Sequence, residues 1–96
     1  MKSQEIITTL RSEMPKLKKD FGVEEIGLFG SAARNEANTL SDVDVLVKLE
    51  QPSFLKLAGL LNYLENLLHT KVDITTKHKH LSSRFLKSIE RDIVYA

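Results

Sequence analysis

Short apolar segments, one of them strictly alternating, predict four β-strands. Residues 42–49 have the period of two that is typical of a strand with two unlike faces. One face carries Val43, Val45, Val47 and Leu49, and the other carries Asp42, Asp44, Leu46 and Lys48. The segments 23–29, 71–76 and 93–95 are shorter and rich in strand-forming residues.

Apolar residues recur at helical spacing in three other segments, 3–19, 54–68 and 82–91. Pro15 lies inside the first helix and removes one backbone donor, so that helix either kinks or consists of two pieces. Pro52 and Ser53 end the strand before the second helix and cap it. The residues predicted to face inward from these helices are Ile6, Leu10, Met14, Leu17, Phe54, Leu57, Leu60, Leu61, Leu64, Leu67, Leu68, Phe85, Leu86 and Ile89.

The order of these elements indicates an α/β (α+β) fold, a small mixed sheet of about four strands covered by helices. About a dozen residues join the first two strands, so their spacing allows either hairpin-like or crossover pairing. With 96 residues, we expect one domain over 1–96.

Composition changes this fold little but limits the chemistry. Hydrophobic residues make up 42% and charged residues 28%, as in an ordinary globular protein. The chain has no cysteine, so a metal site must use carboxylates or histidines, which favours a hard metal ion. No segment approaches the roughly 20 apolar residues of a membrane span, and we expect a cytoplasmic protein without a membrane partner.

The charge is uneven although the net charge is only +1. Residues 21–53 hold two basic and six acidic side chains, and four of the acids surround one Gly-Ser turn. Asp42 and Asp44 are two residues apart on a strand, so both carboxylates project from one face and can share a cation. An isolated pair of this kind also fits a solvent-facing edge strand. Paired carboxylates near a phosphate site instead fit Mg²⁺.

The turn is Gly30-Ser31-Ala32-Ala33-Arg34, which leaves the strand at 23–29. Glycine lets the backbone approach a ligand closely, and the free amides of such a turn form an anion-binding concavity. Arg34 can reach a phosphate or a nearby acid such as Glu36, and a plain surface role fits it equally well. Phosphate and metal sites would therefore adjoin.

These motifs, with Ser41-Asp42-Val43-Asp44 following the turn, resemble the minimal (MNT-type) members of the DNA polymerase β-like nucleotidyltransferase superfamily. The resemblance implies that Gly30, Ser31 and Arg34 bind a nucleoside triphosphate. It also implies that Asp42, Asp44 and Asp73 are catalytic and bind two Mg²⁺ ions, with Asp73 as the base. The family usually has glycine where this chain has Asn35, a residue that tolerates a left-handed backbone.

MNT-type proteins are typically antitoxins of HEPN-domain toxins, and some transfer AMP to a tyrosine of that partner. The resemblance therefore implies ATP as donor, a HEPN protein as partner and a protein hydroxyl as acceptor. The low net charge argues against a nucleic-acid partner. Two alternatives remain: a non-catalytic module that neutralises its partner by binding, and an enzyme that modifies a small molecule.

Overall fold

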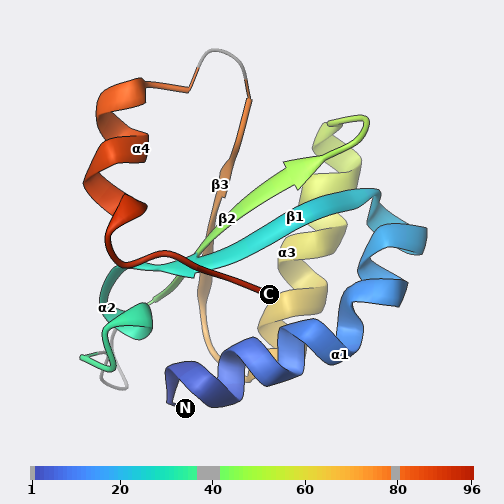
Figure 1. Cartoon of the computed structure of the whole chain (residues 1–96). Coiled ribbons are helices and arrows are strands. Elements are labelled where there is room, and N and C mark those ends of the chain that lie inside the picture. Colours follow the sequence, from blue (N-terminus) through green and yellow to red (C-terminus); the bar gives the residue numbers. More distant parts are fainter. Residues whose placement is uncertain (1, 37–41, 79–80) are drawn as a thin grey trace.

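The computed structural model describes residues 2–36, 42–78 and 81–96, and Figure 1 shows the arrangement of its helices and strands. The bounds of the elements, in chain order, are α1 Ser3–Phe21, β1 Val23–Phe29, α2 Gly30–Ala33, β2 Val43–Leu49, α3 Phe54–Leu68, β3 Val72–Thr76, α4 Ser83–Glu90 and β4 Val94–Tyr95. The four strands and three longer helices predicted from the sequence are confirmed, with ends that differ by one or two residues. Most of the predicted loops at 35–41 and 77–80 lie outside the described residues.

The strands form one mixed sheet in the order β3-β2-β1-β4. β1 is antiparallel to β2 and to β4, whereas β2 is parallel to β3. Spacing alone allowed either hairpin-like or crossover pairing of the first two strands, and the structure shows that β1 and β2 pair antiparallel. Strand β2 lies between β1 and β3, so residues of all three strands form continuous rows across the sheet.

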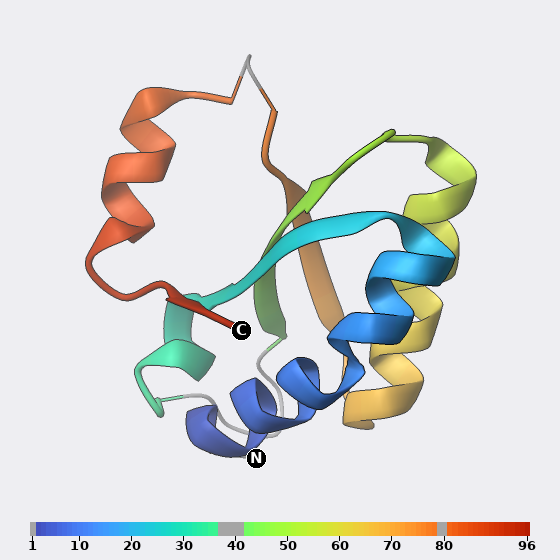
Figure 2. The ribbon, with the colours of Figure 1, turned by 45° about the vertical axis from the view of Figure 1, so that its right-hand side comes forward.

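The helices α1 and α3 cover one face of the sheet, below and to the right of the strands in Figure 2. The alternation of β2 dictates this layer, because Val43, Val45 and Val47 all point into it and are at most 5% exposed. Leu10 of α1 and Leu64 of α3 are completely buried against them. Among the described residues, no helix is both long and apolar enough to cross a membrane.

Helix α1 runs unbroken through Pro15, so the two-piece alternative is wrong, and the helix ends two residues later than expected. The helix ends at Gly22, which adopts the left-handed conformation with φ 68° and donates its N–H to the carbonyl of Lys18. Phe21 then packs against Tyr63 of α3 at 5.7 Å between ring centroids, and the Tyr63 hydroxyl donates to Glu13. These contacts hold α1 and α3 together.

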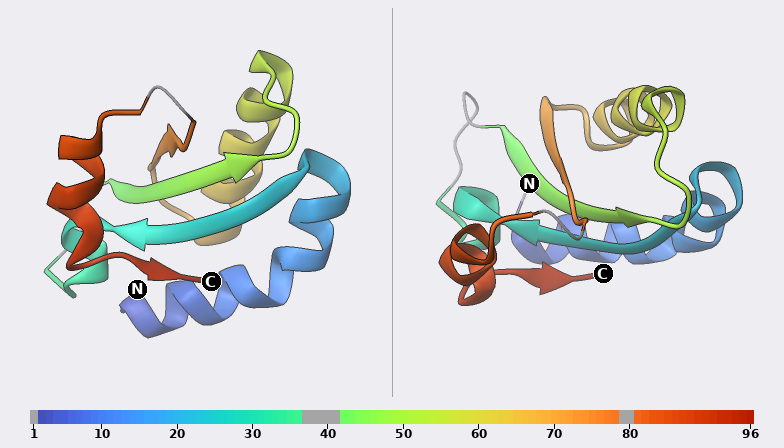
Figure 3. Two further views of the ribbon diagram at one scale, coloured as in Figure 1. Left: turned by 45° about the horizontal axis from the view of Figure 1, so that its top comes forward. Right: turned by 90° about the horizontal axis from the view of Figure 1, so that it is seen from above.

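Helix α4 covers the opposite face of the sheet, as the two views of Figure 3 show. Its Ile89 packs on Phe29 of β1 and Leu46 of β2 in a second, smaller apolar cluster. Phe85 meets Phe29 edge to face at 5.8 Å between ring centroids. The even-numbered residues of β2, which are Asp44, Leu46 and Lys48, therefore point to the same face as α4, which covers this face only in part.

The larger core should control stability. We expect Leu10→Ala to lower the free energy of unfolding by about 2–5 kcal/mol, because a fully buried leucine loses its contacts and leaves a cavity. Urea denaturation followed by circular dichroism measures the change. The matched control is Leu55→Ala, since Leu55 is 82% exposed and its truncation should cost less than about 0.5 kcal/mol. Equal losses in both variants would contradict the assigned core.

Candidate active site

One row of residues across the sheet brings together the end of β1 and two of the predicted acids. Phe29 of β1 lies opposite Asp44 of β2, and Asp44 lies opposite Asp73 of β3. Neighbouring strands are about 4.8 Å apart, so the Asp44 and Asp73 backbones are direct neighbours. Asp42 lies just before β2, two residues from Asp44, and close enough for its charge to act on that carboxyl. The structure thus gathers all three predicted carboxylates at one end of β2.

Asp44 is the central and least exposed member of this group. Burial raises the pKa of Asp44, and the negative charges of Asp73 and Asp42 raise it further, while the positive charge of Arg34 partly opposes them. Each charge in the group therefore makes the neighbouring charge more costly. This crowding is the electrostatic condition under which a cation binds favourably.

Gly30 is pressed directly against Asp44. Its backbone has φ +73°, and a Cβ atom there would lie 2.5 Å from Asp44 Oδ2 and 3.3 Å from Asp44 Cγ. Only glycine satisfies both the left-handed backbone and this close approach. The contact places the Gly-Ser turn beside the carboxylates, although twelve residues separate Phe29 from Asp42.

The turn itself is a short helix, α2, that begins at Gly30. Phe29 occupies the N-cap position with no side-chain hydrogen bond, so Ser31 lies one residue inside the helix rather than at the cap. The carbonyl of Gly30 accepts the N–H of Arg34 at 3.3 Å, and that of Ser31 accepts the N–H of Glu36 at 2.9 Å. These bonds close the turn without help from a capping side chain.

Asn35 takes the left-handed conformation expected for it, with φ 60°. Its side chain does more than tolerate the turn, because Asn35 Oδ1 accepts the backbone N–H of Ser3 at 2.8 Å. The first residue of α1 is thus tied to the end of α2. A glycine at this position would keep the backbone conformation but could not make this bond.

Arg34 forms two ion pairs at the rim of the site. Its Nε donates to Glu36 and its Nη1 donates to Asp92, both at 3.1 Å. These hydrogen bonds, first with Glu36 and then with Asp92, raise the pKa of Arg34, so the guanidinium stays charged. The predicted reach to Glu36 is confirmed. Asp92 was not predicted, because it is 58 residues from Arg34 and no local pattern marks it.

The donor set suits a hard divalent ion that is completed by a ligand. Within the described residues, no three His, Asp or Glu side chains form a group that could hold a metal ion by themselves. Mg²⁺ usually takes only one or two protein carboxylates and fills its remaining positions with phosphate oxygens and water. Asp42 and Asp44, facing one side of β2 next to Gly30, fit that requirement better than they fit a closed protein cage.

The mixed sheet, with its Gly-Ser turn against an Asp-x-Asp strand, agrees with the resemblance to nucleotidyltransferases. Residues 7–96 match the family model described as the nucleotidyltransferase domain, and this chain belongs to that family. It is 45% identical over 92–93 residues to two curated relatives, whose alignments cover at least 95% of this chain and at least 93% of theirs. One is the protein adenylyltransferase MntA of Thermococcus cleftensis, and the other is a Methanocaldococcus jannaschii protein provisionally given the same activity.

Solved structures confirm the fold. A structure described as a minimal nucleotidyltransferase superposes with a TM-score of 0.79 at 32% identity, covering 98% of this chain and 95% of that one. A chain from the complex of a tri-AMPylated Shewanella oneidensis HEPN toxin with its MNT antitoxin matches with a TM-score of 0.58. That match has 20% identity and covers 97% of this chain and 66% of the other, so it bears on the fold alone.

The contact between Gly30 and Asp44 can be tested by a double-mutant cycle. We expect Gly30→Ala to cost about 2–4 kcal/mol of unfolding free energy, from the left-handed backbone and from the clash with the carboxylate. In an Asp44→Ala background the cost should fall to about 1–2 kcal/mol, because only the backbone strain remains. Guanidinium denaturation of the four proteins gives the coupling. A coupling near zero would show that the two residues are not in contact.

The tie between Asn35 and Ser3 predicts different costs for two substitutions. Asn35→Ala should lower the free energy of unfolding by about 1–3 kcal/mol, because it loses the hydrogen bond and places alanine at positive φ. Asn35→Gly keeps the backbone and should cost about 1 kcal/mol or less. Thermal and urea unfolding of both variants measure the difference. If glycine proved the worse substitution, the left-handed constraint would be wrong.

Proposed function

We propose that this chain is a Mg²⁺-dependent protein adenylyltransferase that moves AMP from ATP to a hydroxyl group of a partner protein. The observation that carries the proposal is that Gly30 contacts Asp44, and Asp44 lies opposite Asp73, at one end of the sheet. A phosphate-binding turn, a metal-binding acid and a candidate base adjoin there. The name of the relative MntA supports AMP as the transferred group.

Each part of this site has a separate role in the proposed reaction. The backbone amides of the Gly30-Ser31 turn hold the triphosphate, and Arg34 exchanges an acidic partner for a phosphate oxygen. Mg²⁺ held by Asp42 and Asp44 would offset the charge of the phosphates and of the departing pyrophosphate. These carboxylates stay fixed because β2 is held by hydrogen bonds on both sides.

The acceptor hydroxyl attacks the α-phosphorus of ATP. A new oxygen–phosphorus bond forms, the bond to the pyrophosphate oxygen breaks, and the proton of the hydroxyl passes to the Asp73 carboxylate. Asp73 is suited to this task because it lies on the edge strand β3 and is exposed to an incoming partner. Its place opposite Asp44 keeps the base within one strand spacing of the metal-binding acid.

The partner we propose is a HEPN-domain toxin, with a tyrosine as the acceptor and this chain as its antitoxin. One of the matching solved structures is the complex of a tri-AMPylated HEPN toxin of Shewanella oneidensis with an MNT antitoxin. A phenol is also a favourable acceptor, because it loses its proton more readily than an aliphatic hydroxyl. A HEPN protein encoded beside this chain would therefore be the substrate to test.

The test combines the chain with ATP, Mg²⁺ and that neighbouring HEPN protein, and measures AMP adducts by intact-mass spectrometry. We expect adducts with the unsubstituted chain and at least about a hundredfold slower modification with Asp42→Asn plus Asp44→Asn. The matched control is Asp20→Asn plus Glu24→Gln, which removes two exposed charges far from the turn and should retain full activity.

Two results would contradict the proposal. The first is the absence of an adduct under all conditions while the HEPN protein is still neutralised, which would favour a module that acts by binding alone. The second is unchanged modification by the Asp42→Asn plus Asp44→Asn variant, which would place the chemistry elsewhere on the molecule.

A further inference from the structure

Strand β3, which carries Asp73, is an edge of the sheet. Just before the strand, the carbonyl of Lys71 accepts the N–H of Val43 of β2. Just after it, the N–H of Lys77 donates to the carbonyl of Val47. Alternate residues of a strand turn their main-chain groups to the same side, so the odd-numbered residues of β3 bond to β2. The even-numbered residues therefore direct their N–H and C=O groups away from the sheet.

These outward main-chain groups are open from Ile74 to Thr76. At the start of the strand, Glu65 Oε2 accepts the N–H of Val72 at 3.0 Å. Within the described residues, the N–H groups of Ile74 and Thr76 have no acceptor. β3 also lacks the proline, lysine or bulge that commonly protects an exposed edge, whereas β4 at the other edge has only two residues. Strand β3 is thus able to pair with an added strand.

A mainly apolar pocket of about 370 Å³ lies beside this edge, between α3 and β3. Phe54 of α3 contributes to it and is 84% exposed, although it is a large apolar side chain. Asp73 also borders the pocket, so the pocket and the acids adjoin. Exposed apolar surface beside open main-chain groups is typical of a site for an extended peptide. The lining residues are Phe54, Leu57, Ala58, Leu61, Val72, Asp73, Ile74 and Thr76.

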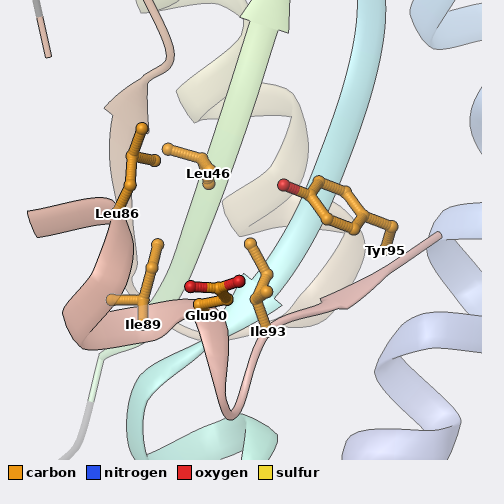
Figure 4. Close-up of a pocket in the computed structure, with 6 residues that line it drawn as sticks. All are labelled: Leu46, Leu86, Ile89, Glu90, Ile93 and Tyr95. Carbon is orange, nitrogen blue, oxygen red and sulfur yellow. The ribbon is translucent and has the colours of Figure 1, made fainter. Parts of the chain in front are cut away.

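The acids are also more accessible from β3 than from β4. On the β4 side, Ile93 and Tyr95 stand over β1 next to the end of α4, as Figure 4 shows. They lie so close to Gly27 that a Cβ atom there would be 3.0–3.1 Å from both side chains. Beyond β3, no further strand pairs with the sheet in the described part of the chain, and Asp73 is exposed. An acceptor therefore has an open approach across β3.

We propose that β3 and this pocket bind the acceptor segment of the partner protein as an added β-strand. The inference rests on the proposed function, because it requires an acceptor hydroxyl to reach Asp73. A residue opposite Asp73 on the added strand would have its Cβ about 4.5–5.5 Å from that of Asp73, on the acid face. Its two neighbours would point to the other face, where Ile74 and α3 form the pocket. The segment is thus extended, with a hydroxyl residue between two apolar residues.

A second copy of this chain fits the same edge less well. Pairing of two β3 strands would bring Asp73 and Asp44 of one copy toward the same acids of the other. These carboxylates already repel one another within a single chain, so their approach would be costly. A partner segment with apolar residues around its hydroxyl adds no negative charge. The charge of the site therefore favours a different protein over a second copy.

The decisive measurement is amide hydrogen exchange, followed by NMR, in the unsubstituted chain with an excess of a short synthetic peptide. The peptide has tyrosine at its centre and leucine on each side of it. We expect exchange at Ile74 and Thr76 to slow by about tenfold or more, because the added strand accepts these N–H groups. The amides of Asp73 and Thr75 already bond to β2 and should change by less than about twofold.

A substitution on the surface of α3 tests the pocket with the HEPN protein as acceptor. Ala58→Arg places a long charged side chain in the pocket from an exposed position, and should raise KM for the HEPN protein by about tenfold or more with little change in kcat. Asn66→Arg is the matched control, because it adds the same charge at an exposed position of α3 outside the lining. Calorimetric affinity for ATP with Mg²⁺ should be equal in both variants.

The apolar neighbours of the acceptor are tested with two peptides that differ only beside the tyrosine. One peptide has leucine on both sides, and the other has aspartate. We expect kcat/KM for AMP transfer to be about tenfold or more higher with leucine, because only leucine fills the pocket and aspartate adds charge near Asp73. Equal values for the two peptides would contradict the inference.

The remaining failures have distinct meanings. If the HEPN protein is modified but its KM is unchanged by Ala58→Arg, or if excess peptide leaves exchange at Ile74 and Thr76 unchanged, β3 does not bind the acceptor and the proposed function stands. Slow exchange at these two amides in the free chain that is lost on dilution would assign the edge to a second copy and overturn the inference. If the unsubstituted chain modifies neither the HEPN protein nor the peptides, the proposed function is wrong and the inference fails with it.

Discussion

Burial of the odd-numbered residues of β2 is the constraint on which the rest of the structure depends. Val43, Val45 and Val47 are almost inaccessible to solvent beneath α1 and α3. Since successive side chains of a strand point to opposite faces, this burial forces Asp44 and Leu46 to the other face. A slip of one residue would place a carboxylate in the apolar core, so the register is strongly specified.

The same register assembles the acids at an energetic cost. Asp44 lies opposite Asp73 and against Gly30, and burial together with the neighbouring charges raises the pKa of Asp44. Such a group holds its proton more tightly in the folded than in the unfolded state, so its contribution to stability decreases as the pH rises. The fold therefore tolerates local destabilisation at the point where a cation and a phosphate would be bound.

The opposite face of the sheet can be described as three successive rows. Phe29, Asp44 and Asp73 form the first, and Tyr95, Gly27 and Leu46 form the second. Beyond them, Lys48 and Lys77 pair with Glu25 at 3.9 and 3.5 Å, and Lys77 lies over the Tyr95 ring at 5.8 Å. Acidic, apolar and mixed-charge rows follow one another along the strands.

The sequence alone was sufficient for features that depend on local spacing. The period of two in 42–49 located β2 and put Asp42 and Asp44 on one face, and helical spacing located α1, α3 and α4 to within one or two residues. The left-handed turn at Asn35 was also foreseeable, because few residues adopt that conformation readily. In each case the cause acts over a few neighbouring residues, so the chain carries a visible pattern.

Tertiary structure decided every feature that depends on how distant segments align. The antiparallel pairing of β1 with β2, the position of Asp73 opposite Asp44, and the ion pair between Arg34 and Asp92 all join residues far apart in the sequence. The close approach of Ile93 and Tyr95 to Gly27 likewise exists only because β4 lies beside β1. Register between strands is set by packing of the whole core rather than by local preference, and one sequence contains no periodic signal for it.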